Sequence, residues 1–78
     1  MTIENTIIHD FADMDRIDIV AALKKKKLSL RRLSVDAGLA AGTLANTMNR
    51  KWPKGEMIIA NALNMKPEEI WPTRYLAE

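Results

Sequence analysis

The sequence has no cysteine, and it contains only three glycines, three prolines and one histidine among its 78 residues. Without cysteine the chain can form neither disulfides nor thiolate zinc sites. A single imidazole, that of His9, argues against a catalytic triad and against a multi-histidine metal site. The glycines stand apart, so no phosphate-cradling loop is present. We therefore expect no enzyme activity, no cofactor and no bound metal.

Long apolar stretches are also missing. No segment approaches the roughly 18 apolar residues that a membrane span requires. The short apolar pair Ile7–Ile8 is preceded by Glu4 and by no basic residue, which is the wrong charge order for a secretory signal. The sequence therefore predicts a cytoplasmic protein with no membrane partner, and no small-molecule effector is evident.

The chain is long enough for one small domain. At 47% hydrophobic residues it can form a core, but a domain of this size buries only about 60% of the surface that its unfolded chain exposes. We divide the chain into an N-terminal extension, residues 1–12, and a folded domain, residues 13–76. The four aspartates between Asp10 and Asp18 favour the start of a helix rather than an ion site.

The capping and helix-breaking residues stand where helices would begin and end. Asp13 or Asp15 caps a first helix that runs to about Lys27, and Ser29 caps a second one over residues 30–37. A third helix spans about residues 40–50, Pro53 opens a fourth that ends near residue 63, and residues 66–70 form a last turn. The apolar stripe of the first helix is assigned to Ile17, Val20, Ala21 and Leu23. The fold class is all-α, with four to five helices.

Residues 30–48 match the requirements of a helix-turn-helix. Gly38 supplies the turn residue that tolerates a positive φ, and Ser34 is the small residue where the two helices cross. The second helix must be locked onto the first by apolar side chains, for which the sequence offers Leu33, Ala37, Leu39 and Leu44.

The third helix of this motif enters the major groove of DNA. If Leu44 and Met48 point inward, Gly42, Asn46 and Asn49 point outward at about 100° per residue. Small residues at the start permit close approach, and the Asn46 amide can pair with adenine, while Arg50 suits guanine or phosphate. We predict seven base-reading residues, namely Ala41, Gly42, Thr43, Ala45, Asn46, Asn49 and Arg50.

The charges are segregated along the chain. Residues 24–54 hold nine basic residues and one acid, a net charge of +8, whereas the remainder carries −6. Such an arrangement favours a positive face that binds a polyanion. We predict phosphate contacts from Ser29, Arg31, Arg32, Lys51, Lys54 and Lys27. For the run Lys24–Lys27 taken alone, an ordinary solvated helix face is the slightly favoured interpretation.

Trp52 and Trp71 are each followed by proline at a helix junction. Aromatic side chains can stack on the bases of single-stranded nucleic acid. At such junctions we favour a core role instead.

Several motifs resemble those of the Ner family, the repressors of phage Mu and their bacterial Ner-like (Nlp) relatives. They are Trp52-Pro53-Lys54-Gly55-Glu56, Ile58-Ile59-Ala60-Asn61-Ala62-Leu63 and Ile70-Trp71-Pro72-Thr73-Arg74-Tyr75, with further agreement from Asp13 onward. The resemblance implies a lambda-repressor-like fold of five helices. It also implies a regulator that binds operator DNA, either a phage repressor of early transcription or a bacterial regulator of host genes.

The sequence therefore predicts a sequence-specific duplex-DNA-binding regulator that binds as a homodimer or as paired monomers. A helical protein-interaction module, or an anti-repressor without strong DNA affinity, is the alternative. Ile3, Ile7, Ile8 and Phe11 would supply its apolar surface. RNA binding ranks third, because the shape of A-form RNA does not call for a groove-sized helix.

Overall fold

A computed structural model describes residues 13–75, and the regular secondary structure in that range is entirely helical. The α-helices are α2 (Arg16–Lys25), α3 (Leu30–Asp36), α4 (Pro53–Leu63) and α5 (Pro67–Ile70); the 3₁₀ segments are η1 (Leu44–Met48) and η2 (Pro72–Arg74). The predicted all-α class is confirmed. Within this range no helix is both long and apolar enough to cross a bilayer. The expected extension, residues 1–12, lies outside the described residues.

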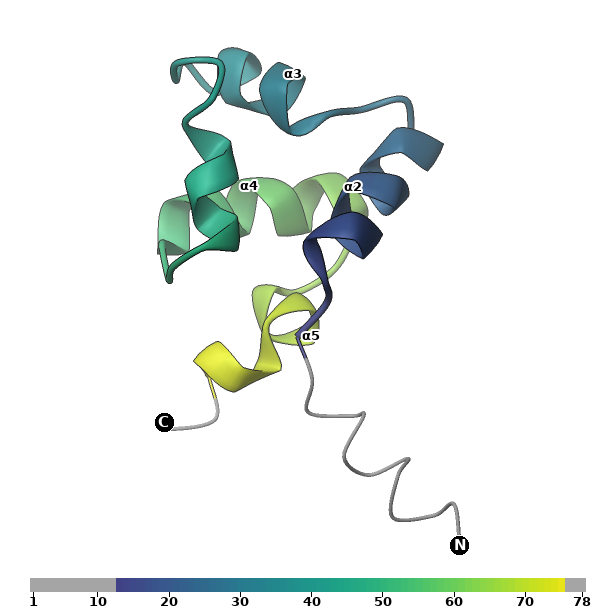
Figure 1. The fold of residues 1–78 in the computed structure, drawn as a ribbon, viewed down its shortest axis with the longest axis vertical. Helices are drawn as coiled ribbons and strands as arrows, with labels where there is room; N and C mark the ends of the chain where they lie inside the picture. Colours follow the sequence, from purple (N-terminus) through teal and green to yellow (C-terminus); the bar gives the residue numbers. More distant parts are fainter. Residues whose placement is uncertain (1–12, 76–78) are drawn as a thin grey trace, which may run out of the picture.

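Helix α4 is the centre of the domain. It contacts α2, α3, η1 and α5, and Figure 1 shows it crossing behind α2 and η1, with α3 above and α5 below. Pro53 starts the helix at a position where the missing N–H costs nothing. The buried apolar residues around α4 are Ile19, Leu23, Leu44, Ile59, Ala60, Leu63, Ile70 and Trp71.

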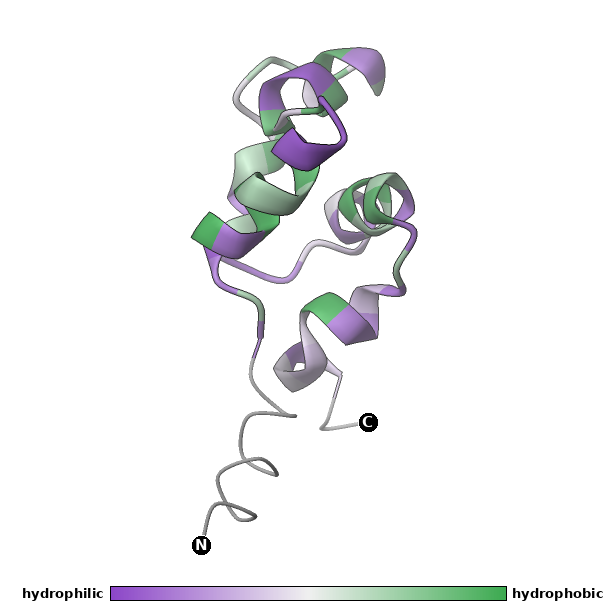
Figure 2. Cartoon of the chain, turned by 90° about the vertical axis from the view of Figure 1, so that its right-hand side faces the viewer, coloured by the Kyte–Doolittle hydropathy of each residue, from purple (hydrophilic) through white to green (hydrophobic). Residues whose placement is uncertain are grey.

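The predicted apolar face of α2 is confirmed for Leu23 and wrong for Ile17, Val20 and Ala21. Ile19 and Leu23 are buried, whereas Ile17 is 79% exposed and Val20 is 41% exposed; Ala21 is exposed as well. Apolar residues occur on both sides of this helix, as the hydropathy colours in Figure 2 show. The spacing alone could not decide between the two faces; contact with α4 selects the one that carries Ile19 and Leu23.

The two ends of the described chain are joined by polar contacts. The carboxylate of Asp13 accepts hydrogen bonds from the N–H of Thr73 at 2.9 Å and from its hydroxyl at 2.7 Å. The N–H of Met14 donates to the carbonyl of Ile70 at 2.9 Å. Asp13 therefore does not cap α2, and Asp15, which occupies the N-cap position, makes no side-chain cap either.

Three helices end in the same hydrogen-bond pattern, the Schellman motif, in which one residue adopts a left-handed conformation. Gly38 does so after α3 with φ 80°, as predicted; Lys27 after α2 and Asn64 after α4 have φ 62° and 59°. The bond from the Leu28 N–H to the Leu23 carbonyl at 2.9 Å closes the motif after α2. Helix α2 therefore ends at Lys25, before the predicted Lys27.

Replacing Lys27 with glycine should stabilise the domain. A residue with a side chain in the left-handed region costs about 1–2 kcal/mol of stability. Glycine avoids this cost, but its greater conformational freedom in the unfolded chain cancels part of the gain. We expect the free energy of unfolding in urea to rise by about 0.5 kcal/mol. Asn64→Gly is the control and should gain less, because asparagine tolerates this conformation. A loss of stability in Lys27→Gly would contradict the assignment.

The third helix of the motif is shorter and tighter than predicted. Instead of an α-helix over residues 40–50, a turn leads into η1. The N–H groups of Thr43, Asn46 and Asn49 each bond to the carbonyl three residues earlier, at 3.0 Å. Threonine and asparagine, which recur over residues 43–49, have low α-helix propensity and disfavour an ordinary α-helix there, although the leucine, alanine and methionine of η1 do not. With three residues per turn, Thr47 shares the fully buried side with Leu44, while Met48 is half-buried and still packs against the core, as expected.

Gly55 permits the close contact between α4 and η1. A Cβ atom on this residue would lie 2.2 Å from Thr47 Oγ1 and 2.5 Å from Trp52 Cε3, whereas the same atom on Gly42 would meet nothing within 4 Å. The backbone of α4 therefore packs directly against Thr47 and Trp52, and only glycine fits there.

Gly55→Ala should lower the free energy of unfolding by about 1–3 kcal/mol, because the added methyl group forces η1 away from α4. Gly42→Ala is the matched control and should be neutral or slightly stabilising. Urea unfolding followed by tryptophan fluorescence measures both variants. Equal stability of the two variants would contradict this expectation and show that η1 can move away from α4 without a loss of free energy.

Candidate nucleic-acid interface

The turn between α3 and η1 has the predicted geometry and one feature beyond it. Ser34 is fully buried, and its Oγ accepts the N–H of Leu44 at 2.8 Å. This bond satisfies a backbone donor at the start of η1, where no intrahelical acceptor is available. Leu33 and Leu39 are half-buried beside it, but Ala37 is exposed and does not lock the motif as predicted. Helix α3 ends at Asp36, which leaves Ala37 in the turn.

Three polar side chains follow one another in a row along η1 and its two caps, whereas the remaining polar residue, Thr47, is buried. In a 3₁₀ helix, residues three apart lie in line, so Thr43, Asn46 and Asn49 follow one another along the helix. Asn46 and Asn49 are exposed, and Thr43 is half-buried. Gly42 and Arg50 are exposed at either end, while Ala41 and Ala45 are half-buried. All seven predicted base-reading residues therefore lie in or beside η1, in a tighter register than expected.

The start of α3 carries two exposed arginines. The hydroxyl of Ser29 accepts the N–H of Arg32 at 3.1 Å, which confirms the predicted cap. Arg32 Nε also contacts both carboxylate oxygens of Asp36 at 3.2 Å. Because the Arg32 side chain is 71% exposed, this ion pair contributes little and leaves the guanidinium able to change partner.

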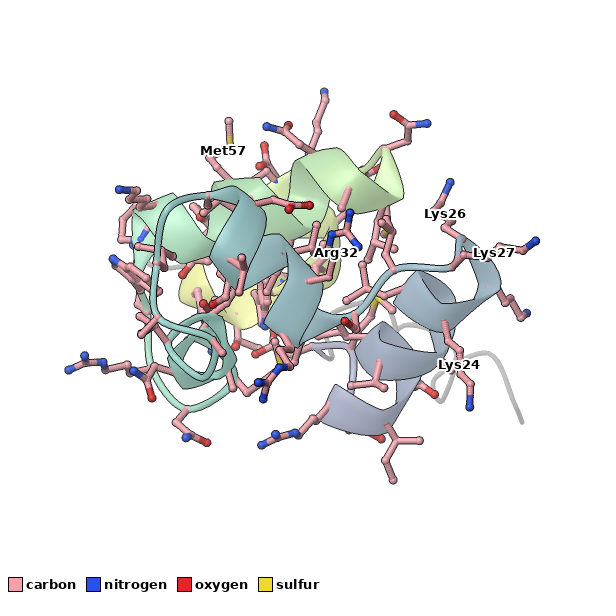
Figure 3. The ribbon with its side chains drawn as sticks, turned by 90° about the horizontal axis from the view of Figure 1, so that it is seen from above. Lys24, Lys26, Lys27, Arg32 and Met57 are labelled. Carbon is pink, nitrogen blue, oxygen red and sulfur yellow. The ribbon has the colours of Figure 1, made fainter. Side chains whose placement is uncertain are left out.

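The other predicted phosphate-binding residues are spread over the molecule. Lys51 Nζ donates to the carbonyl of Arg74 at 3.3 Å and lies 5.0 Å from the centre of the Tyr75 ring. Lys54 is exposed in the first turn of α4. Lys27 is not grouped with them: Figure 3 shows Lys24, Lys26 and Lys27 projecting at the end of the domain opposite η1.

A buried carboxylate lies behind η1, and sequence reasoning missed it. Glu56 is fully buried. Its Oε2 accepts the N–H of Trp52 at 2.9 Å and Arg74 Nη1 at 3.1 Å, and its Oε1 accepts the Tyr75 hydroxyl. The residues belong to the two motifs that marked the family resemblance, Trp52–Glu56 and Ile70–Tyr75. The motifs marked these residues as characteristic of the family, but the sequence did not indicate that their side chains contact one another.

The titration of this cluster follows from its contacts. Burial by itself would raise the pKa of Glu56, but hydrogen bonds from Tyr75, Trp52 and Arg74, with the guanidinium charge, outweigh it and leave that pKa below its ordinary value. The hydrogen bond to Glu56, with burial and the carboxylate charge, raises the pKa of Tyr75 to about 12. At neutral pH the carboxylate is charged and the phenol keeps its proton.

These shifts predict two pH limits of stability. A lowered pKa of Glu56 contributes stability above its unfolded pKa of about 4.3, and that contribution is lost as the pH falls further. The raised pKa of Tyr75 contributes below about pH 10 and is lost between about pH 10 and 12. In urea unfolding, the deficit of Glu56→Gln should shrink below about pH 4, and that of Tyr75→Phe above pH 10. A deficit that stays constant with pH would contradict the assignment.

The fold and the exposed row define a class, the helix-turn-helix DNA-binding domains. A family model described as winged helix-turn-helix DNA-binding matches residues 13–78. Residues 13–75 themselves contain no strand. They also contain no group of three side chains suited to hold a metal ion.

The two tryptophans have the core role predicted for them. Trp71 is buried, at 2% exposure, and half-buried Trp52 packs against the same core.

Similar proteins identify the family within this class. A negative regulator of transcription from Escherichia phage Mu is 62% identical over 65 residues, which cover 83% of this chain and 87% of that protein. Sugar fermentation stimulation protein B of Escherichia coli K12 is 52% identical over 66 residues, 85% and 72% of the two chains. The solution structure of the Mu Ner protein matches with a TM-score of 0.74 at 61% identity, covering 85% and 89%. The chain belongs to the Ner family of helix-turn-helix DNA-binding proteins.

Proposed function

We propose that the chain is a repressor of transcription that binds operator DNA as a duplex and reads the major groove with residues 40–50. The observation that carries the proposal is the exposed pair Asn46, in η1, and Asn49, at its C-cap; the Ser34–Leu44 hydrogen bond holds η1 against α3. A recognition element needs outward hydrogen-bonding groups on a rigidly held segment. The role is regulatory and not enzymatic.

Base reading is assigned to η1 and the turn before it. The amide of Asn46 offers one donor and one acceptor, which suits the N6 and N7 edge of adenine. Asn49 lies one 3₁₀ turn further along and reads a neighbouring position. Exposed Gly42 and half-buried Ala41, Thr43 and Ala45 let the backbone approach the bases, and Arg50 binds guanine or phosphate.

Phosphate contacts are assigned to the flanks. Arg31 and Arg32, with the capping Ser29, stand where the first helix of the motif crosses the DNA backbone. Lys51 and Lys54 follow η1 and face the other wall of the groove. Lys27 lies at the far end from η1 (Figure 3), so it would reach phosphate only on a duplex that continues past α3.

The named relatives favour repression over a protein-interaction role. A phage protein described as a negative regulator of transcription shares 62% identity with this chain, and a prophage DNA-binding protein Ner of Haemophilus influenzae shares 40% over 63 residues. The relatives include both phage or prophage proteins and a bacterial protein, so the proposal covers a phage or prophage repressor and a bacterial Ner-like regulator alike. The role requires access to the genome, which agrees with the cytoplasmic location expected from the sequence.

Asn46→Ala should reduce discrimination, and Arg31→Ala should reduce affinity. Duplexes selected from a random pool by the purified protein define the preferred site. Loss of a bidentate base contact should cost Asn46→Ala about 1–3 kcal/mol of preference for that site over random duplex. Arg31→Ala should weaken both duplexes alike and reduce the slope of log K against log salt by about 0.9. Asn61→Ala, an exposed asparagine on α4, is the control and should change neither.

Two results would contradict the assignment. Selection that enriches no sequence would reject sequence-specific binding, and parallel losses on both duplexes in Asn46→Ala and Arg31→Ala would reject the division of roles. The selected sites also report the oligomeric state. Two half-sites spaced by about one helical turn, roughly 10 base pairs, indicate a homodimer or paired monomers.

A further inference from the structure

The C-terminal end of η1 depends on a residue far away in the sequence. The last carbonyls of any helix have no partner within it, and η1 is only five residues long. Arg74 Nη2 lies 2.7 Å from the carbonyl oxygen of Thr47 and 3.5 Å from that of Met48. The guanidinium thus satisfies the end of η1 and places positive charge at its negative pole.

Besides the carbonyls of η1, the Arg74 side chain contacts Glu56 and Trp71. Its Nη1 contacts Glu56 Oε2 at 3.1 Å, and the Arg74 side chain is 14% exposed against 0% for Glu56. The central carbon of the guanidinium lies 4.9 Å from the centre of the Trp71 ring. The planar fork therefore joins the first turn of α4 to the last turn of η1, a geometry that the compact ammonium of lysine cannot reproduce.

The two base-reading asparagines flank this attachment. Asn46 precedes Thr47, and Asn49 follows Met48. A helical segment of only five residues is too short to be stable by itself, and it holds its conformation through contacts with the rest of the fold. Ser34 provides such a contact at the start of η1, and Arg74 provides one at its end.

We propose that Arg74 is a positioning residue for DNA recognition: it sets the direction in which Asn46 and Asn49 face the duplex, without contacting DNA itself. The inference rests on the proposed function of η1. It assigns the C-terminal motif Ile70–Tyr75 a part in specificity and not only in folding.

Arg74→Lys tests the proposal, because it keeps the charge beside Glu56 but loses the fork. On the duplex selected by the wild-type protein, the ratio of specific to random affinity should fall about tenfold, since misplaced amides lose base discrimination. The salt slope should stay at the wild-type value, because no phosphate contact is lost.

Thr73→Ala is the matched control. Thr73 neighbours Arg74 in η2, and its bonds to Asp13 hold the chain ends together without reaching η1. The variant should lose stability while it keeps the specificity ratio. Should Arg74→Lys fail to fold, Glu56→Gln replaces it; that variant leaves Arg74 in place with a weaker hold, and a smaller loss of the ratio is expected.

Amide hydrogen exchange without DNA provides an independent readout. Exchange at the N–H groups of Asn46 and Asn49 should accelerate in Arg74→Lys relative to amides of α2, and should not do so in Thr73→Ala.

Three results would overturn the proposal: an unchanged ratio in Arg74→Lys, a salt slope reduced by about 0.9, which would indicate direct phosphate contact, or an equal loss of the ratio in Thr73→Ala. If the wild-type protein itself selects no sequence, the proposed function fails instead, and the exchange measurement alone decides whether Arg74 orders η1.

Discussion

The burial of one carboxylate constrains much of this domain. A fully buried charge is costly unless every lone pair finds a donor, and Glu56 meets that demand with the N–H of Trp52, the guanidinium of Arg74 and the hydroxyl of Tyr75. These donors come from the start of α4 and from the end of the described chain. The chain must therefore return to α4 after α5, and the path through η2 is the one that brings Arg74 and Tyr75 there.

The same device compensates for a small core. With eight buried apolar residues among those described, the domain has little apolar surface to bury, and small domains commonly need additional ties. Disulfides are excluded by the absence of cysteine. Polar contacts between distant segments take their place: Glu56 with Arg74, Asp13 with Thr73, and Ser34 with Leu44.

The features that sequence predicted are local ones. Ser29 as a cap, Gly38 as the turn residue and Pro53 as a helix start each act within a few residues, so their chemistry can be read from the sequence alone. The buried face of α2 could not be predicted from the sequence, because both sides of the helix carry apolar residues. Contact with α4 determines which side is buried. Nor could the 3₁₀ winding of η1 be predicted. Three of its five residues, Leu44, Ala45 and Met48, are good helix formers, and the winding depends on contacts from outside the segment. Glu56 and Arg74 are 18 residues apart, and no local pattern pairs them.

The recognition element is too short to be a stable helix by itself. Residues suited to a DNA surface, such as glycine, threonine and asparagine, are also weak helix formers, so base reading and helix stability conflict over residues 42–49. The fold resolves the conflict by separating the two tasks. Asn46 and Asn49 remain exposed, while Ser34 and Arg74 hold the backbone from the buried side. Neither Ser34 nor Arg74 belongs to the exposed row. Substitutions in that row can therefore alter which bases are read and leave the backbone of η1 in place.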